Sequence, residues 1–174
     1  MKKRTVFAFL VVFVLTAGQA LAAPAPKIAV VDLQKAVLEC REGVAAKAVV
    51  LKKADELTAD LKKLGAGLEK AKAELDKGGA KMKPEVRAEK EKQLQKQARD
   101  LQNRQREAQE ELKQMEAGSL KKLVTRLGGI MSRMGDEGGY TAILDKRVGV
   151  FYSNREIELT AQLIKKADEE GAGN

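Results

Sequence analysis

The sequence lacks the side chains on which most catalytic and metal sites depend. Its 174 residues include no histidine, no tryptophan and a single cysteine, Cys40. These absences exclude the usual zinc sites, histidine-based triads and cysteine–histidine nucleophiles. Paired carboxylates such as Glu110 and Glu111 occupy helix positions with no sign of a pocket. We therefore expect no enzyme activity, no metal and no cofactor.

The single thiol also limits how the protein can be stabilised. One cysteine cannot form an internal disulfide, so stability must come from packing or from association between chains. We expect Cys40 to be an unreactive residue at the end of a helix. An interchain or redox role is the alternative.

Aromatic residues are scarce, and their positions are informative. Three of the six lie within the first 13 residues, and the other three follow residue 139: Tyr140, Phe151 and Tyr152. The long segment 44–134 has none. A globular core normally contains several aromatic side chains, so this segment is better interpreted as a helical hairpin. It also lacks the aromatic platforms that bind single-stranded nucleic acid, so no nucleic-acid partner is expected.

Residues 1–22 have the pattern of a cleaved signal peptide. Three basic residues at positions 2–4 precede an apolar run from Val6 to Leu15, and Ala20-Leu21-Ala22 supplies small residues at cleavage spacing. A retained membrane anchor is the alternative, but the apolar run is too short to span a bilayer comfortably. We therefore predict an exported mature chain that begins at Ala23 and carries a net charge of +5.

Residues 44–134, here called the arm, are predicted to form two helices that turn back on each other at residues 78–84. On the outgoing helix the apolar residues alternate at spacings of four and three, which is typical of a coiled coil: Val50, Ala54, Leu57, Leu61, Leu64, Leu68, Ala71 and Leu75. At about 1.5 Å per residue this helix would reach roughly 50 Å, so it should project from a compact domain. Gly65 and Gly67 each cost about 1 kcal/mol relative to alanine and mark a soft point.

The returning helix is predicted to begin at Pro84, because proline fits the first helical turn. Its apolar repeat is thin near the tip, at Leu94, Leu101, Ala108 and Met115. Toward the base the repeat strengthens and shifts by one residue, at Leu120, Leu123, Leu127, Ile130 and Met134. We interpret this shift as the point where the arm enters a thicker body.

The segments on either side of the arm are predicted to form that body. Residues 23–43 would supply a buried strand at 27–31, a helix N-cap at Asp32 and a short helix broken or bent near Gly43. Residues 135–170 would supply two strands, at 140–144 and 148–152.

A last helix is expected to follow these strands. Ser153 and Glu156 would form a capping box at its start, and the helix would carry apolar residues at Ile157, Ala161 and Ile164. Residues 171–174 would form a flexible tail. The predicted fold class is α+β and predominantly helical, with a small β-rich body and a long antiparallel coiled-coil helical hairpin as the arm.

Charge is unevenly distributed along the mature chain. The arm has 22 basic and 14 acidic residues, whereas the rest has 8 basic and 11 acidic residues. Around the tip, residues 70–99 have 10 basic and 5 acidic residues. Such an excess should attract acidic partners, including acidic unfolded chains and anionic lipid head groups, through a salt-sensitive field. The alternative is a solvated helical surface of i,i+4 ion pairs.

These segments follow one another in a recognisable order. Lys27-Ile28-Ala29-Val30-Val31-Asp32-Leu33-Gln34 follows a signal peptide, a long charged hairpin comes next, and Ala142-Ile143-Leu144-Asp145 runs into Val150-Phe151-Tyr152 and a short last helix. This order resembles the Skp/OmpH family of periplasmic chaperones. The resemblance implies a periplasmic homotrimer whose body carries three helical arms around a cavity. It also implies an ATP-independent holdase that binds unfolded outer-membrane proteins and prevents their aggregation.

Such a function would use apolar and basic side chains near the tip. The candidates for client contact are Leu68, Leu75, Met82, Val86, Leu94, Lys77, Lys81 and Lys83. The candidates for the body core or the oligomer interface are Ile28, Val30, Ile143, Leu144, Val150 and Phe151. A thin body without a disulfide also favours oligomerisation. The alternatives are an envelope spacer or adaptor that binds a folded partner, and binding to an anionic lipid or lipopolysaccharide surface.

Overall fold

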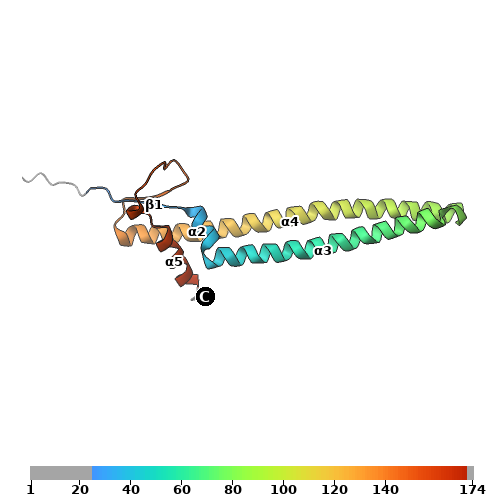
Figure 1. The fold of residues 1–174 in the computed structure, drawn as a ribbon, viewed down its shortest axis with the longest axis horizontal. Helices are drawn as coiled ribbons and strands as arrows, with labels where there is room; N and C mark the ends of the chain where they lie inside the picture. The colour runs from blue at the N-terminus through green and yellow to red at the C-terminus, as the bar shows by residue number, and fades with distance from the viewer. Residues whose placement is uncertain (1–24, 172–174) are drawn as a thin grey trace, which may run out of the picture.

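The computed structural model describes residues 25–171. Two long helices extend together from one small group of elements (Figure 1). Helix α3 (Arg41–Gly78) leads away from this group, and α4 (Pro84–Gly138) leads back to it. The 3₁₀ turn η1 (Gly79–Lys81) joins them at the far end. The two long helices expected from the apolar repeat are therefore present, and each extends a few residues beyond the predicted arm.

Local chemistry explains the limits of α4. Pro84 occupies its first turn, as predicted, where the missing N–H costs no hydrogen bond. Gly139 ends it in the left-handed conformation, with φ at 62°, and the Tyr140 N–H donates to the Gly135 carbonyl at 2.9 Å. This is the usual glycine-terminated helix end, and a side chain at residue 139 would be strained there.

The start of α3 differs from the prediction. Helix α2 (Leu33–Glu39) begins at the predicted cap, because Asp32 Oδ1 accepts from the Lys35 N–H at 2.9 Å. The break that follows is at Cys40, whose backbone is extended, rather than at Gly43. Gly43 lies inside α3, where a Cβ would overlap the Val37 carbonyl. Glycine there allows α3 to pass close to α2 instead of ending a helix.

The sheet is smaller than the predicted β-rich body. Strand β1 (Ile28–Val31) pairs in parallel with β2 (Ala142–Asp145), with Ile28 opposite Ala142. On the other side of β1, a single bridge joins Val30 to Glu158, and the Leu159 N–H donates to the Val30 carbonyl at 2.8 Å. The sheet therefore has two strands within the described residues, and most of the body is helical.

The predicted strand at 148–152 is not formed. This segment is irregular, and its aromatic side chains lie in solvent, with Phe151 103% and Tyr152 87% exposed. A β-branched and aromatic run becomes a strand only when a neighbouring strand accepts its backbone hydrogen bonds. The rest of the described chain offers this segment no such neighbour.

The predicted start of the last helix was also wrong. Asn154, not Ser153, caps a 3₁₀ turn, η2 (Arg155–Ile157), by accepting from the Glu156 N–H at 3.3 Å. Helix α5 (Thr160–Gly171) begins three residues after that turn. Its buried residues are Thr160, Leu163 and Ala167. Of the predicted apolar set, Ile164 packs against the core, whereas Ala161 is exposed and Ile157 belongs to η2.

The core lies where the last third of α4 meets α2, α5 and β1. Eleven buried residues form it: Ala29, Val31, Ala36, Cys40, Leu123, Leu127, Ile130, Met134, Leu159, Leu163 and Ala167. Cys40 is a free thiol inside this core, and it lies at the end of α2, the kind of position that was expected for it. Leu120, expected to extend the apolar stripe of α4, is half-exposed.

The predicted body residues divide between the core and the surface. Val30 is buried, Ile143 packs against the core, and Val150 is half-buried. The remaining three, Ile28, Leu144 and Phe151, lie outside the core, because no third strand or other element of residues 25–171 covers them. Their assignment to an oligomer interface stays a prediction.

The predicted signal peptide, residues 1–22, and most of the predicted tail lie outside the described residues. Among the helices of residues 25–171, none combines the length and the apolar character that a membrane span requires.

Candidate functional site

The outer arm, defined as residues 44–119, has a thin interface between its two helices. Its fully buried residues are Leu57, Ala108 and Gly79. Leu64, expected on the seam, is 49% exposed, and the neighbouring Gly65 takes the more buried position. The predicted seam is kept on either side, because Leu61 and Leu68 are both half-buried.

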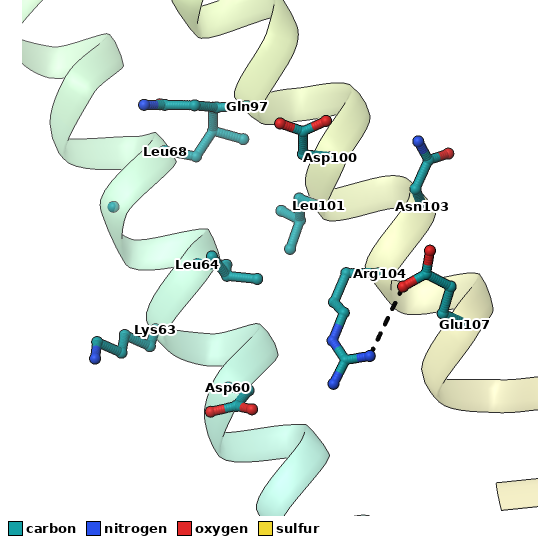
Figure 2. A pocket seen from close by; sticks show the side chains of 11 residues that line it. Asp60, Lys63, Leu64, Leu68, Gln97, Asp100, Leu101, Asn103, Arg104 and Glu107 are labelled. Atoms are coloured by element: carbon teal, nitrogen blue, oxygen red, sulfur yellow. Dashed lines mark ion pairs between the residues drawn. The ribbon is translucent and has the colours of Figure 1, made fainter. Parts of the chain in front are cut away.

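A groove of about 810 Å³ lies between the helices beside Leu64. Figure 2 shows Leu64 and Leu68 from α3 and Leu101 from α4 at the space between the two helices. The Arg104 side chain reaches into the same space from α4 (Figure 2). The groove therefore combines an apolar floor with a charged side chain that can contact polar groups.

Glycine and charge explain why this part of the arm is open. Gly67 lines the groove, and a Cβ built on it would meet nothing within 4 Å. Arg104 occupies an inward position on α4 where a tightly packed seam would hold an apolar side chain, and its nearest carboxylate, on Glu107, is 3.7 Å away. The sequence predicted a soft point at the glycines but not the inward arginine.

The predicted client-contact residues do not form one site. Leu68 lines the groove, whereas Leu75, Met82 and Leu94 are half-buried farther toward the tip. The other apolar candidate, Val86, is 48% exposed, and the three lysines at 77, 81 and 83 are exposed. The structure thus distributes these side chains along the outer part of the arm and over its end.

Ion pairs are rare near the tip. Among the described residues, Arg87 is the only basic residue between 70 and 99 within 4.0 Å of a carboxylate, that of Glu91 at 2.9 Å. The predicted alternative of a surface neutralised by i,i+4 pairs therefore fits poorly here. Most of the positive charge at the tip is available to an external partner.

The middle of the arm has a cross-helix ion pair. Lys53 Nζ on α3 lies 2.7 Å from Glu111 Oε1 on α4. The hydrogen bond from Lys53 lowers the pKa of the Glu111 carboxyl, and the same bond raises the pKa of Lys53. Both groups are therefore charged near neutral pH, and the pair links α3 to α4 on the body side of the groove.

A second apolar surface lies at the base of the arm. Two adjoining grooves, of about 240 and 590 Å³, share Val37, Leu38 and Leu120. Leu38 and Leu120 are each more than half exposed. Sequence periodicity missed this surface, because it placed Leu120 on the buried stripe. Among residues 25–171, no group of three or more side chains is arranged to hold a metal ion.

Comparisons with known proteins agree with this architecture. Among solved structures, a similar one is a protein from Caulobacter crescentus CB15 described as a candidate outer membrane chaperone (OmpH-like). The two chains superpose with a TM-score of 0.79 over 86% of this chain and 88% of the other, at 17% sequence identity. This likeness supports the fold. A search of curated proteins found no match.

The family assignment comes from the sequence itself. Residues 27–166 match the family described as "Outer membrane protein (OmpH-like)". The match extends from the residue before β1 into α5 and so covers the whole arm and most of the body. The chain therefore belongs to the OmpH-like family of outer membrane proteins.

Proposed function

We propose that this protein is an ATP-independent holdase that binds unfolded outer-membrane proteins in the periplasm. The observation that carries the proposal is the unpaired positive charge at the end of a long, thinly packed arm. Such a charge attracts acidic chains over several ångströms without requiring a particular sequence. Family membership and the fold shared with the Caulobacter protein support the same conclusion.

Binding would combine this attraction with many weak apolar contacts. Leu64, Leu68 and Leu101 around the mid-arm groove, and Val86 near the tip, offer apolar surface that the arm leaves uncovered. Each contact contributes little, so an unfolded client can move among them. Folding of the client in the membrane would then remove it from the binding equilibrium and empty the chaperone.

The proposed assembly is a homotrimer of antiparallel coiled-coil hairpins joined through their bodies. Its support is the exposed apolar segment at 148–152, where Phe151 and Tyr152 contact no core of their own chain. The segment has strand-forming residues, and β2 is an edge strand of a two-stranded sheet. Pairing between segment 148–152 of one copy and β2 of a second copy would give each of them a hydrogen-bonding neighbour. Light scattering should give a trimer mass for the natural protein and a monomer for Phe151→Asp, and a folded natural monomer would contradict the assembly.

An envelope spacer or adaptor remains the alternative function. It would form a complex of defined stoichiometry with a folded protein and would have little affinity for unfolded chains. An outward basic tip could also bind anionic lipid or lipopolysaccharide, and this activity is compatible with the holdase. Sedimentation with vesicles tests lipid binding: the protein should sediment with anionic vesicles and not with neutral ones, since the attraction depends on charge.

The decisive experiment measures aggregation of an outer-membrane β-barrel protein after dilution from urea. A tip variant, K77E/K81E/K83E, should lose most of the suppression seen at low salt. The matched control K47E/K52E/K113E changes the same charge on exposed positions nearer the base. Suppression that is equal in the two variants would contradict recognition by the tip, and a natural protein that fails to suppress aggregation would contradict the holdase.

The groove can be tested separately from the charge. Gly67→Leu should fill the groove without a clash, because the space around that position is open. We expect weaker binding of the unfolded client at high salt, where charge attraction is screened, and little change at low salt. An unchanged affinity at high salt would remove the groove from the proposed binding surface.

A further inference from the structure

Helix α5 lies along α2 and is bonded to both of its ends. At one end, the Asp32 N–H donates to Thr160 Oγ1 at 2.8 Å. At the other end, the Arg41 N–H donates to Asp168 Oδ1 at 2.8 Å. Thr160 and Asp168 are eight residues apart on α5, about 12 Å along the helix. The two short helices therefore run in the same direction, and α5 spans the break between α2 and α3.

The second of these bonds replaces a cap that α3 lacks. A helix begins with backbone N–H groups that have no partner within the helix, and the preceding side chain usually accepts from one of them. The preceding residue here is Cys40, which makes no such bond. Asp168 supplies the acceptor from α5 instead, and its carboxylate also lies 3.7 Å from Arg41 Nε. A negative charge at this end also suits the helix dipole.

Further contacts tie the same end of α5 to both long helices. Arg126 on α4 pairs with Glu42 in the first turn of α3, and its Nη2 donates to the Ala167 carbonyl of α5 at 3.1 Å. Nearby, Arg133 on α4 binds both carboxylate oxygens of Glu170 at 2.7 Å. The last two turns of α5 therefore contact the start of α3 and the side of α4 at once.

The two long helices depend on these contacts to different degrees. Helix α4 enters the core through Leu123, Leu127, Ile130 and Met134, so it stays attached through apolar packing. Helix α3 contributes no residue to that core cluster. Its first turn follows Cys40, the last core residue before it, and is bonded to polar groups of α5 and α4.

We propose that α5 acts as a latch on the outgoing helix of the arm. When Asp168 caps α3, the first turn of α3 is fixed to the body and the arm has one defined direction. When the bond breaks, the start of α3 loosens while α4 stays anchored, so α3 can shift along α4 and move the tip. The latch is a positioning device in the body, independent of what the arm binds.

Hydrogen exchange of the full chain tests the latch. In Asp168→Ala, exchange of the amides at 41–47 should become roughly 2- to 30-fold faster, which corresponds to the usual loss of an N-cap. Amides at 123–134 in α4 should be unchanged. Glu169→Ala is the matched control: its carboxylate points to Lys165 on the same helix at 3.9 Å, and its loss should leave residues 41–47 unchanged.

A second variant separates the cap from the ion pairs. Asp168→Asn keeps a side-chain oxygen that can accept from Arg41 N–H but removes the charge, so it should retain most of the protection. High salt should speed exchange at 41–47 more in the natural protein than in this variant, since salt weakens the charged contact. Uniform faster exchange of α3 and α4 in Asp168→Ala, or equal exchange in Asp168→Ala and the natural protein, would overturn the proposal.

Discussion

The outer arm and the core region, here the body together with residues 120–134, are held together in different ways. In the outer arm, Leu57, Gly79 and Ala108 are the fully buried residues. In the core region, eleven buried residues contact one another, nine from four elements together with Cys40 and Leu159. Helical hydrogen bonds alone give little stability in water, so tertiary packing decides which part opens first. The core region is therefore the stable unit, and the outer arm is the part that can change shape.

Charge is also used differently in the two regions. Most basic residues of the tip have no carboxylate partner, whereas the core region links its elements through ion pairs: Arg126–Glu42, Arg133–Glu170, Lys146–Glu158 and Lys166–Glu137. A hydrogen bond from Lys166 lowers the pKa of Glu137, and one from Lys146 lowers the pKa of Glu158. In the core region the charged side chains link elements of the structure, whereas at the tip of the arm most basic side chains are free to bind a partner.

The strongest test of this contrast compares one leucine from each region. Leu127→Ala removes a fully buried side chain and should lower the free energy of unfolding by about 2–5 kcal/mol. Leu64→Ala, on the half-exposed side of α3, should change it by about 0.5 kcal/mol or less. Urea unfolding followed by circular dichroism at one protein concentration measures both. Equal losses would mean that the outer arm is as tightly packed as the core.

A second test stiffens the outer arm. Gly65→Ala and Gly67→Ala should each stabilise α3 by about 1 kcal/mol, because alanine favours the helix and a Cβ at either position meets nothing within 4 Å. Hydrogen exchange at 60–72 should slow while the core region is unchanged. Gly43→Ala is the control in the same helix, and it should destabilise the protein because its Cβ overlaps the Val37 carbonyl. Faster exchange at 60–72 in a variant that combines Gly65→Ala with Gly67→Ala would contradict the prediction that these glycines weaken α3.

A third test acts on the core region through the backbone. Gly139→Ala should cost about 1 kcal/mol, because residue 139 has a left-handed backbone at the end of α4. Thermal unfolding should shift downward, with no change in exchange at the tip. Gly118→Ala, inside α4 with open space around it, should instead be neutral or stabilising. A Gly139→Ala variant more stable than the natural protein would show that residue 139 does not need the left-handed backbone conformation.

The smallest expected effect is the pH dependence of the outer arm. The pKa of Glu111 is lowered by Lys53, so the pair stabilises the folded arm above the ordinary glutamate value of about 4.3, and this stability is lost as the pH falls below it. The pKa of Lys53 is raised, so on the alkaline side the pair persists until the pH exceeds about 10.4.

Thermal unfolding of Glu111→Gln across this acidic range checks the pair. The variant should be slightly less stable than the natural protein at pH 6 and should match it near pH 3. Glu110→Gln, which removes a neighbouring carboxylate that binds Gln114 at 3.0 Å, serves as the control. A difference between Glu111→Gln and the natural protein that persists at pH 3 would assign the effect to packing.

Features encoded by local sequence could be predicted. The Asp32 cap, the Pro84 start and the two long helices depend on residues within one or two turns of each other. The apolar stripe at Leu123, Leu127, Ile130 and Met134 was also correct, because it repeats over about three consecutive turns of one helix.

Features that depend on distant parts of the chain could not be predicted. Within residues 25–171, the strand-forming segment 148–152 has no partner strand, and Leu64 lies beside the seam although Leu61 and Leu68 keep the predicted positions. The mid-arm groove is lined by Gly67 of α3 and Arg104 of α4, which only the pairing of the two helices brings to one place. The hydrogen bond by which Asp168 caps α3 joins residues 127 positions apart, so it cannot be predicted from a local sequence pattern.

The parallel pairing of β1 with β2 also constrains the order of folding. Lys27 and Thr141, hydrogen-bonded at the edge of this pair, are 114 residues apart in the chain. Closing so long a loop directly is slow and entropically costly. Once α3 and α4 have paired from the turn at Gly79, however, the start of α3 already lies beside Arg126 of α4, and the remaining search involves only short segments. A chain that emerges from its N-terminus should therefore build the arm first and complete the body last, when β2 and α5 become available.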